Sequence, residues 1–204
     1  TTPDLYPMVR GRLVEVNGAA VKPKSFANER AQRLAEREFN LSWSREARAD
    51  NPLVAGEWWK PDANSKELSV EEGIAQTLGI KVGDSLTWDV AGTRFTGKVT
   101  NLRKVDWDSF KPNFFVVASP GLLEGFPASY ITSFALKPGN ESVVNALIAR
   151  FPNVSVIDLT AIMAQVKRIT EQVSKAVEFV FIFALAAGAV VLYAAIIATQ
   201  DERV

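Results

Sequence analysis

The sequence predicts an α+β domain that a long helix connects to a membrane. Three observations lead to this prediction. Segments with the patterns of short strands and helices, separated by Gly and Pro turns, fill residues 1–157. An amphipathic helical repeat covers residues 158–178, and residues 179–198 contain no charged side chain. The chain therefore divides into a core domain, a stalk helix and a transmembrane helix, and residues 199–204 begin the loop that follows.

The first half of the core domain shows strand and helix patterns in turn. Residues 8–16 alternate like a strand up to an Asn-Gly turn, and residues 28–39 carry apolar side chains at helical spacing. Residues 41–44 have the pattern of a short strand. The sequence Ser-Val-Glu-Glu from Ser69 matches a capping box, which predicts a short helix that Gly79 ends.

The second half begins with a hairpin and ends with a crossover. Residues 86–105 alternate on both sides of an Ala-Gly turn, which predicts a β-hairpin. The run FFVVA at 114–118 predicts a buried strand. Residues 130–136 and 154–157 have strand patterns on either side of a helix that Asn140 caps, so they predict a β-α-β unit. A domain with both hairpin and crossover connections is α+β.

The stalk prediction rests on a heptad seam that follows Asp158, a good helix N-cap. Apolar residues recur at alternating spacings of three and four, which is the pattern of a helix that packs on a partner. The seam residues are Leu159, Ile162, Val166, Ile169, Val173 and Ala176. The seam either packs on its own domain or belongs to a rod that joins the domain rigidly to the membrane. We favour the rod.

The membrane prediction rests on residues 179–198, which read FVFIFALAAGAVVLYAAIIA. At about 1.5 Å per residue this helix is about 30 Å long, the thickness of the hydrocarbon core of a bilayer. A helix in a protein core usually keeps a polar stripe, whereas the Tyr193 hydroxyl is the only polar group in this run. A membrane span is therefore favoured over a buried core helix. Together with the stalk, a continuous helix to about Gln200 would be roughly 60 Å long.

Composition argues against several classes of function. The chain has 23 basic and 23 acidic residues and no basic cluster, so we expect no nucleic-acid partner. It contains no His and no Cys, which removes the usual nucleophile and base pairs and the thiolate metal sites. No phosphate-binding loop or nucleophile elbow is present. We therefore predict no catalytic residue, no metal site and no cofactor.

Two groups of carboxylates leave alternatives open. Glu71 and Glu72 have the pattern of a helix's first turn, which we favour over a catalytic pair. Asp106 and Asp108 flank Trp107 on a stretch that reads as a strand. A structural role for these two aspartates is favoured over a cation site.

The aromatic residues also allow two interpretations. In the first, they fill the core of the domain, as such residues usually do. In the second, some of them line an apolar groove that accepts an acyl chain or another hydrophobic ligand. The contacts predicted for that groove are Trp58, Trp59 and Phe126, because Gly and Pro surround them.

Three sequence blocks resemble a known family. Residues 102–121 read LRKVDWDSFKPNFFVVASPG, residues 7–13 read PMVRGRL, and residues 78–84 read LGIKVGD. Together they are similar to the outer domains of FtsX-like (MacB-like) ABC transporter permeases, and the resemblance covers most of the chain. It implies a MacB-like periplasmic core domain, with a porter-like β-α-β unit and a β-rich lobe, carried on stalk helices in the bacterial inner membrane.

The resemblance implies a permease subunit and no enzyme activity in this chain. A separate cytoplasmic ABC ATPase subunit would hydrolyse ATP, and the stalk would transmit helix movement to the periplasmic domain. That domain would help to extract or export a hydrophobic small molecule or lipid. The expected partners are the ATPase subunit, the lipid bilayer and a periplasmic protein. The alternative is a regulatory or scaffolding domain that binds and switches a periplasmic enzyme.

The charges around the span disagree with the periplasmic assignment. Lys167, Arg168 and Lys175 precede the span and only Arg203 follows it, which leans towards a cytoplasmic domain. We follow the family, because too few residues lie beyond the span to count. The chain starts at Thr1 without Met and stops soon after the span. It therefore reads as an internal segment of a longer protein with an earlier transmembrane helix.

Overall fold

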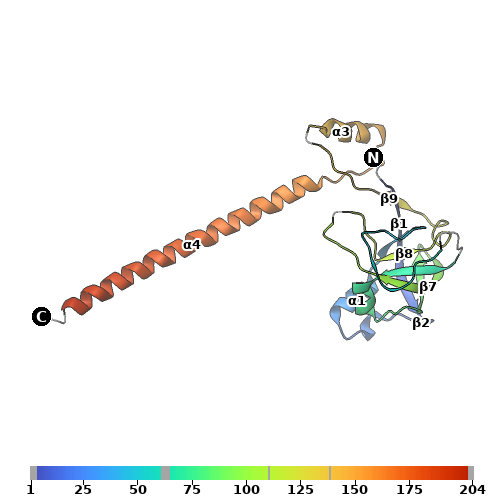
Figure 1. The fold of residues 1–204 in the computed structure, drawn as a ribbon, viewed down its shortest axis with the longest axis horizontal. Coiled ribbons are helices and arrows are strands. Elements are labelled where there is room, and N and C mark those ends of the chain that lie inside the picture. Colours follow the sequence, from blue (N-terminus) through green and yellow to red (C-terminus); the bar gives the residue numbers. More distant parts are fainter. Residues whose placement is uncertain (1–3, 61–64, 110, 138, 202–204) are drawn as a thin grey trace. The chain divides into compact units, whose positions relative to one another are not determined.

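The structure, a computed structural model, describes residues 4–60, 65–109, 111–137 and 139–201. These residues form two units, of which the first ends at Ala135 and the second begins at Leu136. The first unit contains the strands and the short helices of the described chain, and the second contains helices α3 and α4 (Figure 1). The predicted mixture of helix and strand is confirmed.

Six strands of the first unit close into a barrel. In ring order they are β1 (Tyr6–Val16), β3 (Phe39–Trp43), β8 (Val116–Ala118), β5 (Glu67–Glu71), β7 (Thr93–Arg103) and β6 (Ser85–Val90). Each strand pairs with the next, and β6 returns to β1. The β3–β8 and β5–β7 pairs are parallel and the other pairs are antiparallel. Closure leaves no open edge in the ring, so backbone groups are paired all round.

Three shorter strands extend the barrel. β2 (Ala19–Ala20) and β9 (Ser129–Ile131) pair with the two ends of β1, and β4 (Leu53–Gly56) pairs with the end of β7. All residues of these strands are exposed. The sequence patterns did not predict β2 or β4, because these segments lack a clear alternation of apolar and polar residues. β5 does alternate, as ELSVE, but its second half also matches the capping box that was assigned to the following helix.

The short helices begin and end where local chemistry requires. The 3₁₀ helix η1 (Pro23–Ser25) precedes α1 (Glu29–Glu36), and the Asn28 side chain accepts the Arg30 N–H at 2.8 Å as its N-cap. α2 (Glu72–Leu78) ends at Gly79, whose φ of 72° is left-handed. Its predicted N-cap, Ser69, is wrong. Ser69 lies within β5, and the Glu71 carboxylate accepts the first N–H groups of the helix.

The core lies inside the barrel and under α1 and α2. Leu41, Leu68, Leu86 and Val99 are fully buried. Trp88 stands edge-on to Phe39, with the ring centroids 5.6 Å apart. Each fully buried side chain of this size contributes about 1.5–3 kcal/mol through removal from water. This core, rather than any single polar contact, holds the first unit together.

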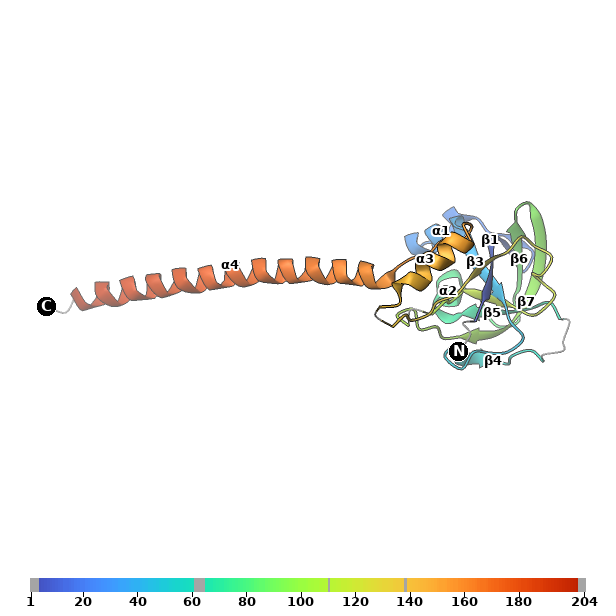
Figure 2. The same ribbon diagram turned by 90° about the horizontal axis from the view of Figure 1, so that it is seen from above.

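The second unit contains two helices of very different length, α3 (Glu141–Arg150) and α4 (Leu159–Asp201). α4 is one unbroken helix of 43 residues, as Figure 2 shows, and at about 1.5 Å per residue it is about 65 Å long. The continuous helix predicted after Asp158 is therefore present. Among the described residues, Ile162–Leu192 has the length and the mean hydropathy, 2.1, of a membrane span, and none of it is buried.

The predicted β-α-β unit is wrong for the described residues. β9 is three residues long, and residues 154–157 form no strand. A strand requires hydrogen bonds from a neighbouring strand, whereas Val154, Val156 and Ile157 are 39%, 38% and 72% exposed. Asn140 precedes α3 as predicted, but its side chain makes no cap hydrogen bond.

Candidate functional site

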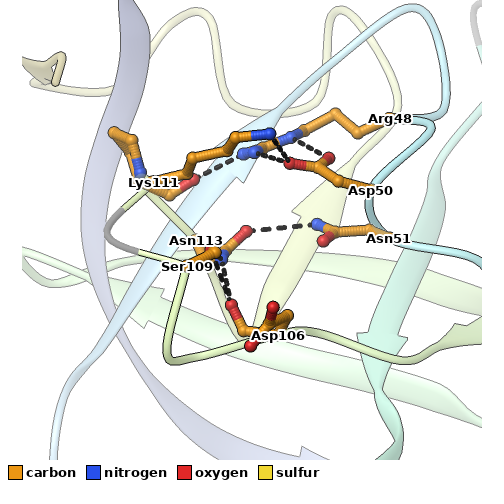
Figure 3. A network of polar contacts seen from close by, with 8 residues as sticks. Arg48, Asp50, Asn51, Asp106, Ser109, Lys111 and Asn113 are labelled. Atoms are coloured by element: carbon orange, nitrogen blue, oxygen red, sulfur yellow. Dashed lines mark hydrogen bonds and ion pairs between the residues drawn. The ribbon is translucent and has the colours of Figure 1, made fainter. Parts of the chain in front are cut away.

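An irregular loop joins β7 to β8 and is held in place by a neighbouring segment (Figure 3). This β7–β8 loop, residues 104–115, contains no helix or strand where it is described. Segment 48–51 lies against it. Arg48 Nη1 donates to the Pro112 carbonyl oxygen, and Asn51 Nδ2 donates to Asn113 Oδ1 at 3.3 Å. These bonds fix a segment that has no secondary structure of its own.

The tip of the loop is a hydrogen-bonded turn around Asp106. The Asp106 carbonyl oxygen accepts the Ser109 hydroxyl at 2.8 Å and Asn113 Nδ2 at 3.0 Å. Asp106 Oδ1 accepts the Asp108 N–H at 3.1 Å, which is an Asx turn. Asp106 and Asp108 therefore lie in a turn and not on the predicted strand, because their side-chain and backbone bonds compete with sheet formation. The geometry supports the structural role that the sequence analysis favoured for these two aspartates over a cation site.

Asp50 links two cations beside the loop. Its carboxylate accepts Arg48 Nε at 3.0 Å and Arg48 Nη2 at 2.7 Å, and Lys111 Nζ lies 3.1 Å from Oδ2. The Arg48 hydrogen bond, with a smaller contribution from Lys111, lowers the pKa of Asp50 from 3.8 to about 2 although burial opposes this. The carboxylate is therefore ionised at all physiological pH values. The Arg48 guanidinium also lies over the Tyr6 ring, 5.0 Å from its centroid.

A buried arginine holds the two ends of the loop. Arg103 is 2% exposed, and its Nη1 donates to the Ser69 carbonyl oxygen at 2.8 Å and to the Ser69 hydroxyl at 3.1 Å. Its Nη2 donates to the carbonyl oxygen of Phe114, just before β8. Burial lowers the pKa of Arg103 to about 10, with Glu71 acting in the opposite direction. The guanidinium is thus charged at neutral pH and fixes the start of β8 against β5.

Trp107 is presented at the tip of this loop. Its side chain is 47% exposed, and its ring centroid lies 4.5 Å from that of Phe115. Phe115 in turn stands edge-on to Phe39 at 5.7 Å, and the Arg37 guanidinium lies over the Phe115 ring at 5.4 Å. The indole therefore lies against Phe115, which packs on the core, and nearly half of the residue is exposed to solvent.

A hollow of about 630 Å³ borders the Arg48–Asp50–Lys111 cluster. Tyr6, Phe134 and Pro112 give it apolar walls, and the charged groups on its lining are Asp4, Arg48, Asp50 and Lys111. These charges sum to zero, so the hollow has no net preference for an anion or a cation.

The three predicted ligand contacts do not form an exposed set. Trp59 is 4% exposed and donates Nε1 to the Ser44 carbonyl oxygen at 3.0 Å, so it belongs to the core and cannot contact a ligand at the surface. Trp58 is half-buried against it, with ring centroids 4.0 Å apart. Phe126 is half-buried and packs against Phe95 at 5.5 Å. Each of the two indole N–H groups donates to a backbone carbonyl oxygen, that of Arg45 for Trp58 and that of Ser44 for Trp59. These hydrogen bonds hold both rings against the segment 44–45.

The predicted seam residues all lie on α4 and are exposed. Ile162, Val166, Ile169 and Val173 are 46–58% exposed, and Leu159 and Ala176 are exposed as well. On another face of the helix, Lys167 Nζ lies 3.9 Å from Glu171 Oε1. The structure thus places these six apolar side chains on one helix without showing what covers them.

No catalytic or metal-binding cluster emerges among the described residues. Within them, no three His, Cys, Asp or Glu side chains lie close enough to hold a metal ion. Glu71 Oε1 and Oε2 accept the N–H groups of Gly73 and Ile74 at 2.9 and 2.7 Å, so this carboxylate caps α2. The pair Glu71 and Glu72 is therefore part of a helix start, as the sequence favoured.

Comparison with known proteins shows what this arrangement is related to. The chain is 40% identical over 198 residues to an uncharacterized ABC transporter permease, YbbP of Escherichia coli K12. The match covers 97% of the chain. The chain is homologous to part of an ABC transporter permease. It spans 23% of the length of that relative.

Two further comparisons add little. No family model matches the chain. A solved domain of a candidate permease from Porphyromonas gingivalis is similar at 13% identity and a TM-score of 0.35, over 74% of this chain and 70% of that one. At that score the likeness carries no argument about the fold.

Sequence reasoning missed Arg103 and the Arg48–Asp50–Lys111 cluster. Arg103 had a readable signal, since it occupies the inward position of an alternating strand after Phe95, Val99 and Asn101. The cluster had none, because Lys111 lies 61 residues from Asp50 in the sequence and the segments that carry them are irregular.

Proposed function

We propose that this chain is a segment of the permease subunit of an FtsX-like (MacB-like) ABC transporter. In this proposal residues 1–157 work outside the membrane in the periplasm, residues 158–178 are a stalk, and residues 179–198 cross the bacterial inner membrane. The observation that carries the proposal is the similarity to an ABC transporter permease along 97% of the chain. The unbroken helix α4 supports it, because it runs from the amphipathic seam into the uncharged segment without a break.

The stalk gives the proposal its mechanism. An unbroken helix transmits axial and rotational movement better than a jointed linker, because its backbone hydrogen bonds resist bending. A separate cytoplasmic ATPase subunit would supply the movement, and the periplasmic domain would use it to extract or export a hydrophobic small molecule or lipid. This chain contributes the moving part and no catalytic residue.

Thiol labelling tests the location of the barrel. Gly125 is exposed, and a Cβ built on it meets no atom within 4 Å, so Gly125→Cys adds a thiol without a clash. The chain has no other Cys. A membrane-impermeant maleimide should label this variant in whole cells that produce the intact permease. Labelling only after lysis would place the barrel in the cytoplasm and overturn the proposal.

Two charge substitutions test the coupling role of α4. Val166→Asp places a charge on the exposed seam, where a partner helix would bury it at a cost of a few kcal/mol. Lys167→Asp is the control, since Lys167 is exposed and its weak ion pair with Glu171 contributes little. The first variant should abolish transport while the ATPase still assembles and hydrolyses ATP, and the second should not. Equal transport by both would mean that α4 is a passive tether.

The second candidate function is a scaffold that binds and regulates a periplasmic enzyme. The exposed Trp107 on a fixed turn favours it, because such a residue serves protein recognition better than force transmission. The two functions are compatible in one chain.

A further inference from the structure

Trp107 is one of three large aromatic residues that are exposed on the described part of the first unit, with Tyr130 at 63% and Phe134 at 48%. Of the three, it is the one that lies on the β7–β8 loop. A tryptophan usually buries most of its area, yet this side chain is 47% exposed at the tip of the β7–β8 loop. The Phe115 ring packs against it, with the ring centroids 4.5 Å apart. The exposed indole surface gains free energy only when another molecule removes it from water.

The turn that carries Trp107 is fixed in advance. Asp106 accepts hydrogen bonds from Asp108, Ser109 and Asn113, and Asn113 is itself bonded to Asn51 on the adjacent segment (Figure 3). The base of the loop is tied by Arg103 to Phe114. A residue held in this way loses little conformational entropy on binding, so its contacts contribute more fully to affinity.

The charges beside Trp107 select the kind of partner. Asp106 and Asp108 are both exposed, and within the described part of the chain neither forms an ion pair. Two carboxylates at the tip oppose insertion into a membrane surface, where anionic lipids repel them and desolvation is costly. The hollow beside Arg48 is lined by other residues, so it does not explain the exposed indole.

We propose that Trp107 is the anchor of a protein–protein interface. The partner is a folded protein that receives the indole in a shallow apolar pocket and places Lys or Arg side chains opposite Asp106 and Asp108. A central tryptophan with a charged rim matches the usual distribution of binding energy in such interfaces. The inference rests on the proposed function only for the compartment in which this partner is met.

Site-specific photocrosslinking in the protein's native cells identifies the partner. The photoreactive amino acid p-benzoylphenylalanine replaces Trp107 in the intact permease, and in a control it replaces Val82, which is exposed to a similar extent at 44%. We expect one protein adduct at position 107 that is absent at position 82. Mass spectrometry identifies the adduct. Adducts with lipid, adducts with a second copy of this chain, or no specific adduct would each overturn the proposal.

Binding measurements with that purified protein decide the role of the indole. Trp107→Ala should raise the dissociation constant at least about tenfold, because removing a central anchor residue typically weakens binding by this amount. Val82→Ala should leave it unchanged. An unchanged constant for Trp107→Ala would overturn the proposal even if the adduct forms.

A charge reversal at Asp108 distinguishes a direct effect on binding from a loss of binding caused by misfolding. Within the described part of the chain, the turn uses the Asp108 N–H and the Asp108 carboxylate forms no hydrogen bond or ion pair, so Asp108→Lys should leave the melting temperature unchanged. It should weaken binding several-fold at low salt and less at high salt, where charges are screened. Binding insensitive to this reversal would contradict a basic rim. If binding fails these tests but Gly125→Cys is labelled in whole cells, the interface proposal is wrong and the permease proposal stands. If binding passes them but Gly125→Cys is labelled only after lysis, the interface stands and the periplasmic location is wrong.

Discussion

The barrel unit and the C-terminal unit carry similar apolar side chains in opposite environments. In the barrel, Val9, Leu41 and Leu68 are completely buried, whereas in the second unit Val166 and Phe179 are 52% and 71% exposed. The barrel strands pair all round and enclose a core, so their backbone and side-chain requirements are met together. A single helix satisfies its backbone hydrogen bonds but cannot bury its own side chains. We therefore expect the barrel to fold without α4, and we expect the apolar side chains of α4 to need a partner or a membrane to cover them.

The largest expected effect is on solubility, and it tests this contrast directly. The complete chain should require detergent, and a chain cut after Ile157 should be a soluble monomer. The reason is that the uncharged run 179–198 is removed while the barrel keeps its whole core. Light scattering after size exclusion measures both. A complete chain that stays monodisperse in plain buffer would show that α4 finds cover without a membrane.

A pair of glycines sharpens the account of barrel stability. Gly56 and Gly18 both have left-handed φ values, 75° and 77°, but a Cβ on Gly56 would lie 2.0 Å from the Thr100 carbonyl oxygen, and one on Gly18 meets nothing within 4 Å. Gly18→Ala should cost about 1 kcal/mol for its conformation alone. Gly56→Ala should cost about 4 kcal/mol or more, because β4 must move away from β7. Urea unfolding of the chain cut after Ile157 measures the free energy of unfolding of both variants. Equal losses would mean that the β4–β7 pairing does not contribute to the stability of the barrel.

The buried arginine is expected to matter slightly less. Arg103→Met should destabilise the barrel by about 2–3 kcal/mol, since the carbonyl oxygens of Ser69 and Phe114 lose a charged donor. Lys104→Met is the matched control, because this neighbouring side chain is exposed and should change stability by less than about 0.5 kcal/mol. Thermal unfolding compares the two. Similar melting temperatures would show that the guanidinium is dispensable to the loop.

The smallest effect concerns acid stability near the β7–β8 loop. The pKa of Asp50 is lowered in the folded chain from 3.8 to about 2, so its ion pairs stabilise the fold above about pH 4 and lose that effect as pH falls to about 2. Asp50→Asn should therefore cost about 1 kcal/mol at pH 6 and nearly nothing at pH 2. Glu29→Gln, in an exposed pair with Arg33, is the control and should change the free energy of unfolding by less than about 0.5 kcal/mol at pH 6. A constant difference at both pH values would contradict a role for the Asp50 charge.

Much of the local structure was readable from the sequence. The β6–β7 hairpin follows from alternation around the Ala91-Gly92 turn, whose φ values of 50° and 86° are the left-handed pair that such a turn requires. α1 lies within residues 28–39, where helical spacing predicted a helix, although it ends at Glu36 and Phe39 belongs to β3. α4 follows from a seam and an uncharged run with no helix breaker. These elements depend on residues that are close in sequence, so they can be predicted without knowledge of the tertiary structure.

Tertiary structure decided the rest. Residues 154–157 have a strand pattern but no neighbouring strand to bond, and β5 takes in Ser69 because β7 and β8 supply partners on both sides. Trp59 is buried because Ser44 offers a carbonyl oxygen to its indole. The loop site depends on Arg48, Asp50 and Arg103 meeting segments far away in the chain. A sequence sets what each segment is able to form, but pairing, burial and charge contacts between distant segments exist only once the barrel closes, because closure is what brings those groups within bonding distance.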